Sequence, residues 1–134
     1  MKKGLHLFLK ALVVASVIAV LFSNTALADD STIDMVVSPN VLNIESKGGS
    51  ISIHTDIGYV SPDDATLEVN GTEVERISTF VDNCGNLVVK CSISTVKVIV
   101  EGSEEAVFVL TAGYNGGVYT GTDTIKVIQV IPNK

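Results

Sequence analysis

The feature that most constrains the fold is a succession of short runs of β-branched and apolar residues, separated by turn-forming residues, after position 29. The segment Ile51–Asp56 shows the pattern best, because strict alternation puts Ile51, Ile53 and Thr55 on one face of a strand and Ser52, His54 and Asp56 on the other. The dipeptide Asn70-Gly71 supplies the two positive φ angles that a type I′ hairpin turn requires. Turn residues recur about every 8–12 residues, as in sandwiches of short strands. The sequence therefore predicts an all-β domain of about seven to eight strands.

The expected strands and turns cover most of this region. Strands are predicted over residues 33–37, 41–44, 51–56, 66–69, 73–79, 87–93, 106–112 and 118–131, and turns over 38–40, 47–49, 57–64, 70–71, 82–86 and 113–117. Residues 94–101 fit either a strand, because they are rich in β-branched residues, or a short helical crossover between two longer strands. Gly121, inside the last expected strand, predicts a β-bulge.

Residues 1–28 have the three parts of a secretory signal peptide. Lys2 and Lys3 form a positive start, an apolar run extends over Ala11–Phe22, and Ala26-Leu27-Ala28 is a small-x-small cleavage motif. The apolar run is shorter than the roughly 20 residues that a membrane-spanning helix needs. We therefore expect cleavage after Ala28 and a secreted or cell-surface protein free of the membrane, with an uncleaved membrane anchor as the alternative.

The charge balance of residues 29–134 limits the classes of partner. Three of the nine Lys and Arg residues and none of the 15 acidic residues fall in the signal segment, which leaves a net charge of −9. Nucleic acids and anionic membrane surfaces need basic patches, so neither is an expected partner. The length suits one domain. Because the chain has no Trp, the core must consist mainly of Val, Ile and Leu.

The turn motifs together resemble those of a known class of β-sandwich. They are Ser38-Pro39-Asn40, Lys47-Gly48-Gly49, Asn70-Gly71 and the turn over residues 82–86. Residues 38–131 are in this respect similar to the immunoglobulin-like and fibronectin-III-like modules of exported prokaryotic proteins. The resemblance implies a Greek-key β-sandwich and carries over no catalytic residue. The chain departs from antibody domains in lacking the Cys…Trp…Cys pattern and a tyrosine corner.

Two cysteines, Cys84 and Cys91, invite the question of a disulfide in an exported chain. Cys84 falls in a predicted turn and Cys91 lies well along the following strand. Seven extended residues span about 20 Å, whereas a disulfide needs Cα atoms within about 7 Å. We therefore expect Cys91 to be a buried apolar residue and Cys84 to be an exposed thiol, free for pairing with another chain.

Catalytic patterns are sparse. His54 is the only histidine after residue 28 and shares a strand face with Asp56, but no Gly-x-Ser-x-Gly motif supplies a nucleophile. The carboxylate pairs Asp63-Asp64 and Glu104-Glu105 fit solvated loops, and a glycosidase cleft would need aromatic platforms as well. A small hydrolase that uses His54 is therefore a minor alternative, and we expect a protein that is not an enzyme and needs no cofactor.

One turn has a composition that calcium sites share. Asp82, Asn83 and Asn86 offer oxygen ligands around Gly85, but the EF-hand spacing and its distal Glu are missing. The same residues are those that a tight turn requires, and this is the preferred interpretation. We expect no metal site, with these three residues as a weak calcium candidate.

In a Greek-key sandwich, alternate loops gather at one end. Residues 57–64, 82–86 and 113–117 would then lie together, and they carry the candidate binding residues Tyr59, Asp63, Asp64, Asp82, Tyr114 and Asn115, with the thiol of Cys84 beside them. Tyrosine among Gly, Asn and Asp is typical of recognition loops. The sequence thus predicts an exported module that binds an extracellular protein or glycan. The alternative is a structural spacer or assembly subunit of the cell envelope that self-associates through Cys84 or by strand addition.

Overall fold

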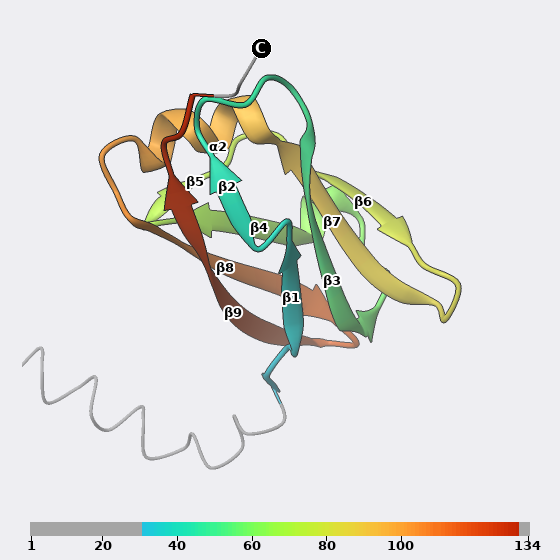
Figure 1. Ribbon diagram of the computed structural model, residues 1–134. Helices are drawn as coiled ribbons and strands as arrows, with labels where there is room; N and C mark the ends of the chain where they lie inside the picture. The colour runs from blue at the N-terminus through green and yellow to red at the C-terminus, as the bar shows by residue number, and fades with distance from the viewer. Residues whose placement is uncertain (1–30, 132–134) are drawn as a thin grey trace, which may run out of the picture. The chain divides into compact units, whose positions relative to one another are not determined.

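The computed structural model describes residues 31–131, which form two facing β-sheets and one α-helix (Figure 1). The elements, in chain order, are β1 (Met35–Ser38), β2 (Val41–Asn43), β3 (Ser50–Gly58), the 3₁₀-helix η2 (Pro62–Asp64), β4 (Ala65–Val69), β5 (Thr72–Glu73), β6 (Ser78–Val81), β7 (Asn86–Ser92), α2 (Ile93–Val100), β8 (Glu105–Tyr114) and β9 (Gly117–Ile128). The predicted signal peptide lies outside the described residues.

Each sheet combines strands that are distant in the sequence. The first sheet has the order β1-β3-β7-β6 and the second the order β2-β9-β8-β4-β5. The pairings are antiparallel except for β2 with β9, which is parallel. The prediction of an all-β domain is confirmed. Within residues 31–131 the strand count exceeds the expected seven to eight because two short strands, β5 and β6, stand where one strand over residues 73–79 was expected.

The alternation in the sequence determines which side chains enter the core. Along β3, Ile51, Ile53 and Ile57 are buried, while His54 and Asp56 face solvent. Along β8 the buried positions include Phe108, which is the largest of the fully buried side chains. Aliphatic residues of both sheets fill the space between them, so a core without Trp forms mainly from Val, Ile and Leu as predicted.

Residues 94–101 take the helical alternative. The helix begins where the Ser92 hydroxyl accepts a hydrogen bond from the Ser94 N–H, at 3.0 Å, as an N-cap does. Val96 and Val100 then fall on one helix face and are buried, whereas Val98 faces solvent. Burial of this face outweighs the modest preference of β-branched residues for strands, because such preferences are weaker than tertiary packing.

The predicted strand over residues 73–79 is wrong. After the Asn70-Gly71 turn, β5 ends at Glu73, and the chain crosses from the second sheet to the first before β6 begins at Ser78. Buried Val74 and half-buried Ile77 hold this crossing against the core. The apolar residues of the segment therefore serve a passage between sheets and not a continuous strand.

The predicted bulge at Gly121 is also wrong. Gly121 pairs regularly with Leu110 in the β8–β9 ladder. A Cβ atom at this position would lie 2.5 Å from the carbonyl oxygen of Ile33 and 3.1 Å from the sulfur of Met35. Glycine is needed because the backbone that precedes β1 crosses directly over β9.

This crossing closes one side of the sandwich. The Ile33 N–H donates to the Thr120 carbonyl at 2.9 Å, and the Val37 N–H on β1 donates to the Asp123 carboxylate on β9 at 2.9 Å. The β1 edge of the first sheet is thereby tied to the second sheet, which leaves β6 at the opposite edge of the first sheet.

Candidate functional site

The three loops singled out in the sequence lie at one end of the described domain, away from α2 (Figure 1). Gly58 at the end of β3 pairs with Asn86 at the start of β7, which joins the first loop to the second. A Cβ on Gly113 would lie 3.8 Å from the Asp64 carbonyl oxygen, which places the third loop beside the first. We call residues 57–64, 82–86 and 113–117 the loop end.

The turn over residues 82–86 is built by Asp82. One oxygen of its carboxylate, Oδ1, accepts the backbone N–H of Cys84 at 2.8 Å and that of Asn86 at 2.9 Å. Gly85 adopts a φ of 85°, as the left-handed position of a three-residue hairpin loop does. These N–H groups, first that of Asn86 and then that of Cys84, hold the pKa of the Asp82 carboxyl below its usual value. Asp82 therefore organises the turn, as the preferred interpretation of its sequence indicates.

Tyr114 is half-buried and fixed by its neighbours. Its ring lies edge-on to that of Tyr119, with 5.7 Å between centroids and 72° between planes. A Cβ on Gly58 would lie 2.8 Å from the Tyr114 hydroxyl, so the ring covers the backbone at the end of β3. Tyr114, in the loop over residues 113–117, thus packs against the loop over residues 57–64, and only part of its ring faces solvent.

Tyr59 is the more accessible of the two predicted tyrosines. Half of its surface (51%) is exposed. Its hydroxyl oxygen accepts a hydrogen bond from the Thr79 hydroxyl on β6 at 3.2 Å, which fixes the ring orientation. A large aromatic surface held in one orientation loses little conformational entropy when it binds a partner.

The remaining predicted binding residues are polar and exposed. Asp63 and Asp64 form η2, where the Asp64 carboxylate accepts the Ser61 hydroxyl at 3.3 Å. Asn115 has a φ of 55° and, with Gly116, makes the two-residue turn between β8 and β9. All six predicted binding residues therefore lie at the loop end, although Asp82 and Tyr114 also have clear structural tasks there.

Carboxylates extend this end beyond the predicted residues. Asp56 follows His54 on β3, and its Oδ1 accepts the backbone N–H of Asp34 at 3.0 Å. Asp34 and Asp56 therefore border the loop end. The sequence did not predict that Asp34 lies there, because it precedes the first predicted turn and is distant from Asp56 along the chain. The loop end itself contains three aspartates and neither Lys nor Arg.

Both cysteines are free, as predicted. Cys84 is exposed at the tip of the β6–β7 hairpin, and Cys91 is buried in the core. Burial raises the pKa of the Cys91 thiol to about 11. Cys84 is thus the accessible thiol of the described residues.

His54 is exposed on the outer face of the first sheet, where its cross-strand neighbours are Val36 and Val88. The oxygen Oδ1 of Asp56 accepts the Asp34 N–H, and none of the hydrogen bonds within residues 31–131 links His54 to a serine or a carboxylate. The surroundings of His54 therefore do not resemble a catalytic triad, in which the histidine bonds both partners.

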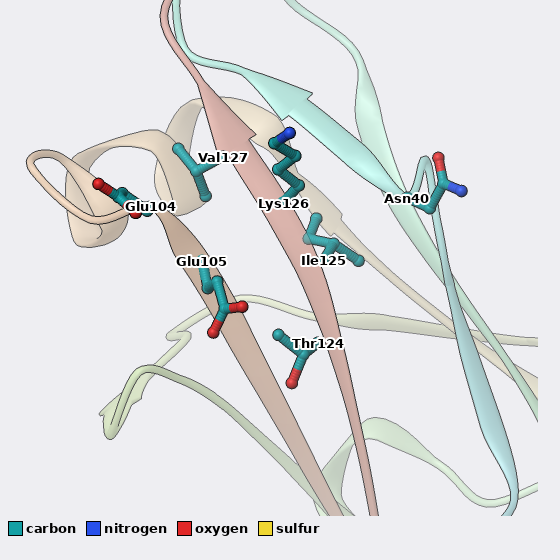
Figure 2. A pocket seen from close by; sticks show the side chains of 7 residues that line it. All are labelled: Asn40, Glu104, Glu105, Thr124, Ile125, Lys126 and Val127. Carbon is teal, nitrogen blue, oxygen red and sulfur yellow. The ribbon is translucent and has the colours of Figure 1, made fainter.

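A hollow of about 790 Å³ lies on the second sheet, next to the strand pair β8–β9 (Figure 2). Glu104, Glu105 and Lys126 are among its lining residues. Figure 2 shows their charged groups pointing in different directions and not toward a common point. An active site needs polar groups that converge on one substrate atom, so this hollow is a weak candidate for chemistry.

Residues 31–131 contain no group of three or more His, Cys, Asp or Glu side chains placed to hold a metal ion. No helix in this range combines the length and the apolar character that crossing a bilayer demands.

Comparison with known proteins gives no family. No protein-family model matches the chain, and no curated protein matches it.

Proposed function

We propose that this chain is an exported, non-enzymatic binding module with an immunoglobulin-like Greek-key fold. It is directed out of the cytoplasm by residues 1–28 and recognises an extracellular protein or glycan through the loop end. The loop end is accordingly the surface that contacts the partner.

The strand order supports the immunoglobulin-like assignment. Immunoglobulin domains have strands A, B, E and D in one sheet and C, F and G in the other, with an added C′ strand in variable-type domains. The order β1-β3-β7-β6 corresponds to A-B-E-D. In the order β2-β9-β8-β4-β5, the last four strands correspond to G-F-C-C′, and β2 is an additional edge strand. Residues 57–64 and 113–117 then correspond to the B–C and F–G loops, which carry recognition in variable domains.

One observation carries the binding role. The loop end brings an exposed, oriented Tyr59 together with Asp63, Asp64 and Asp82, in loops without Lys or Arg. Complementary charge guides encounter and excludes wrong partners, and tyrosine supplies contact area. The chemistry of the partner follows from this: its contacting surface is rich in Lys or Arg, or in the amino groups of a cationic glycan.

The experiment is affinity capture with the purified exported protein. The immobilised protein is exposed to proteins of the source cell envelope and culture medium, and separately to a panel of neutral, anionic and cationic glycans. A loop-end variant combines Tyr59→Ala, Asp63→Asn and Asp64→Asn. The matched control is Glu101→Gln, because Glu101 is an exposed acid that follows α2, away from the loop end. Asp82 is left unchanged because it builds its turn.

We expect the wild type and the Glu101→Gln control to retain the same partner, and the loop-end variant to bind it at least tenfold more weakly. Binding should weaken as salt is added, because the contacts are largely between exposed charges. Equal capture by the loop-end variant and the wild type would contradict the proposal, as would a partner that only anionic glycans provide.

A structural assembly subunit is the second candidate, and the exposed β6 edge is the observation that favours it. A hydrolase that uses His54 gains no support from the hydrogen bonds around that residue.

A further inference from the structure

The edge of the first sheet at β6 lacks the protection that edge strands usually carry. The strand Ser78–Val81 contains no proline and no charged residue, and its outer side pairs with no other described strand. Exposed edges of this kind can pair with another chain and are commonly blunted by short length, Lys, Pro, a bulge or a covering segment. The strand β6 is short, at four residues, but the described part of the structure gives it none of the other protections. The other edge of this sheet is protected, since the Asp123 carboxylate accepts the β1 N–H of Val37.

The backbone groups that face outward can be assigned from the ladder. The Asp82 N–H donates to the Asn86 carbonyl at 2.9 Å, and Phe80 pairs with Val88 two residues further along. Hydrogen-bonded and non-hydrogen-bonded pairs alternate in antiparallel ladders, so Phe80 bonds inward to β7. The N–H and C=O groups of Thr79 and Val81 therefore point away from the sheet.

The outer face of this edge carries one large apolar side chain, that of Phe80, which is 47% exposed. Val81 is also exposed but lies on the opposite face, because successive residues of a strand alternate. Val88, the neighbour of Phe80 on β7, points away from the core yet is only 5% exposed. A cross-strand row formed by Val36, His54, Val88 and Phe80, in which His54 is the polar member, thus crosses the outer face of the sheet and ends at Phe80.

A second copy of the same strand complements this edge in one antiparallel register. With a two-fold axis at Phe80, Thr79 of each copy exchanges N–H···O=C bonds with Val81 of the other. The two Phe80 residues then form a non-hydrogen-bonded pair, the arrangement in which cross-strand side chains are closest and aromatic pairs are favourable. The cross-strand row continues across both copies.

The charges agree with the same register. Ser78 lies opposite Asp82 of the second copy, and a hollow of about 570 Å³ next to Ser78 is lined by Arg76, Lys90 and Phe80, among others. The Lys90 ammonium already lies 5.2 Å from the centre of the Phe80 ring. Asp82 of each copy is therefore brought beside two basic residues of the other, and no like charges meet across the two strands.

We propose that β6 is a self-association surface, through which two copies of this chain form a two-fold symmetric dimer with a continuous sheet. The two Cys84 thiols then lie more than about 20 Å apart, from about 3.4 Å per residue on either side of the axis. This exceeds the reach of a disulfide. Strand addition and pairing through Cys84, the two routes that the sequence left open, therefore cannot join the same two copies.

The experiment measures the mass of the full exported chain by sedimentation over a wide concentration series. We expect a concentration-dependent dimer that neither reductant nor Cys84→Ser changes. Phe80→Lys and Phe80→Glu each place like charges opposite one another at the axis, so each variant alone should dimerise at least tenfold more weakly. An equimolar mixture of the two variants should recover dimers, because opposite charges then meet.

Two further variants control the experiment. Val98→Lys also replaces an exposed apolar residue by lysine, but on α2, and should dimerise like the wild type. Val81→Pro removes an outward N–H without removing a bond to β7, and should abolish the dimer while far-ultraviolet circular dichroism shows a folded protein. A monomer at every concentration would overturn the proposal, as would a dimer lost in Cys84→Ser or no recovery in the Phe80 mixture.

Discussion

Gly121→Ala tests the closure of the sandwich by the segment before β1. The added methyl group would lie 2.5 Å from the carbonyl oxygen of Ile33, 2.8 Å from the Cβ of Ile33 and 3.1 Å from the sulfur of Met35. The first of these atoms belongs to the backbone, so no side-chain rotation relieves the contact. Either β9 and the crossing segment move apart, or the segment detaches.

The two responses bracket the cost in free energy of unfolding. Forcing a methyl group into a packed site costs about 1–3 kcal/mol. Detachment would expose Ile33 and Met35, which are only 2% and 8% exposed, and each such side chain contributes about 1.5–3 kcal/mol when buried. Detachment of both side chains would therefore cost about 3–6 kcal/mol, more than the strain of moving the two segments apart. Because the protein adopts the cheaper response, we expect Gly121→Ala to lower the free energy of unfolding by about 1–3 kcal/mol.

Urea denaturation followed by far-ultraviolet circular dichroism measures this change. The matched control is Gly113→Ala in the same hairpin, where the nearest atom would lie at an ordinary 3.8 Å from the new Cβ. The control should stay within about 0.5 kcal/mol of the wild type. Equal stability of the Gly121→Ala variant and the wild type would refute the close backbone crossing.

Three further predictions concern the loop end and the cysteines. A thiol reagent should label Cys84 in the native protein and Cys91 only after unfolding. Burial raises the pKa of Cys91 from 9.0 to about 11, so the stability that its neutral thiol contributes should be complete below pH 9 and be lost as the pH approaches 11. In urea titrations, the Cys91→Val variant should lack this loss of stability between pH 9 and pH 11. Gly58→Ala should displace the Tyr114 ring and alter its near-ultraviolet circular dichroism with Tyr119, while an unchanged aromatic spectrum would contradict the packing. Backbone N–H groups lower the pKa of Asp82, so the stability that its carboxylate contributes should be present above pH 3.8 and be lost as the pH falls through the lowered pKa. The Asp82→Ala variant should therefore lose less stability on acidification than the wild type. An equal loss in both proteins would contradict the hydrogen bonds from Cys84 and Asn86 to the Asp82 carboxylate.

Local turn chemistry could be predicted from the sequence because each turn has few solutions. Asn70-Gly71 adopts the two positive φ angles, 51° and 85°, that its residue types favour. The Asp82 turn follows the same logic, since its carboxylate bonds the N–H groups of its own loop. The faces of β3 likewise follow from alternation, which has a period of two in any strand.

Features that depend on distant segments could not be predicted. After Glu73 the chain crosses between the sheets, and Val74 and Ile77 pack against the core along this crossing. Both are β-branched residues, which also favour a strand, so the sequence alone could not distinguish the two. Gly121 lies against the backbone of Ile33, which is distant in the sequence. A glycine inside a strand can mark either a bulge or such a close backbone approach, so the sequence around Gly121 could not distinguish them. The half-buried position of Tyr114 depends on Gly58 and Tyr119 in the same way.

The candidate site shows the same division. Grouping of the three loops followed from the expected architecture, and the structure places them together. The sequence did not predict that Asp82 and Tyr114 stabilise these loops through their own contacts, which leaves less of each side chain exposed for binding. The cross-strand row that ends at Phe80 could not be predicted either, because it joins single residues from four strands.

Site-specific photocrosslinking tests the proposed binding surface most directly. A photoreactive phenylalanine replaces Tyr59 at the loop end in one sample and Val98 on α2 in another, both exposed positions, and each protein is irradiated with the proteins and glycans of the envelope and culture medium. Recognition through the loop end predicts, from position 59 and not from position 98, a covalent adduct with a protein or glycan other than a second copy of this chain. An adduct from position 98 alone, or the same adducts from both positions, would contradict it.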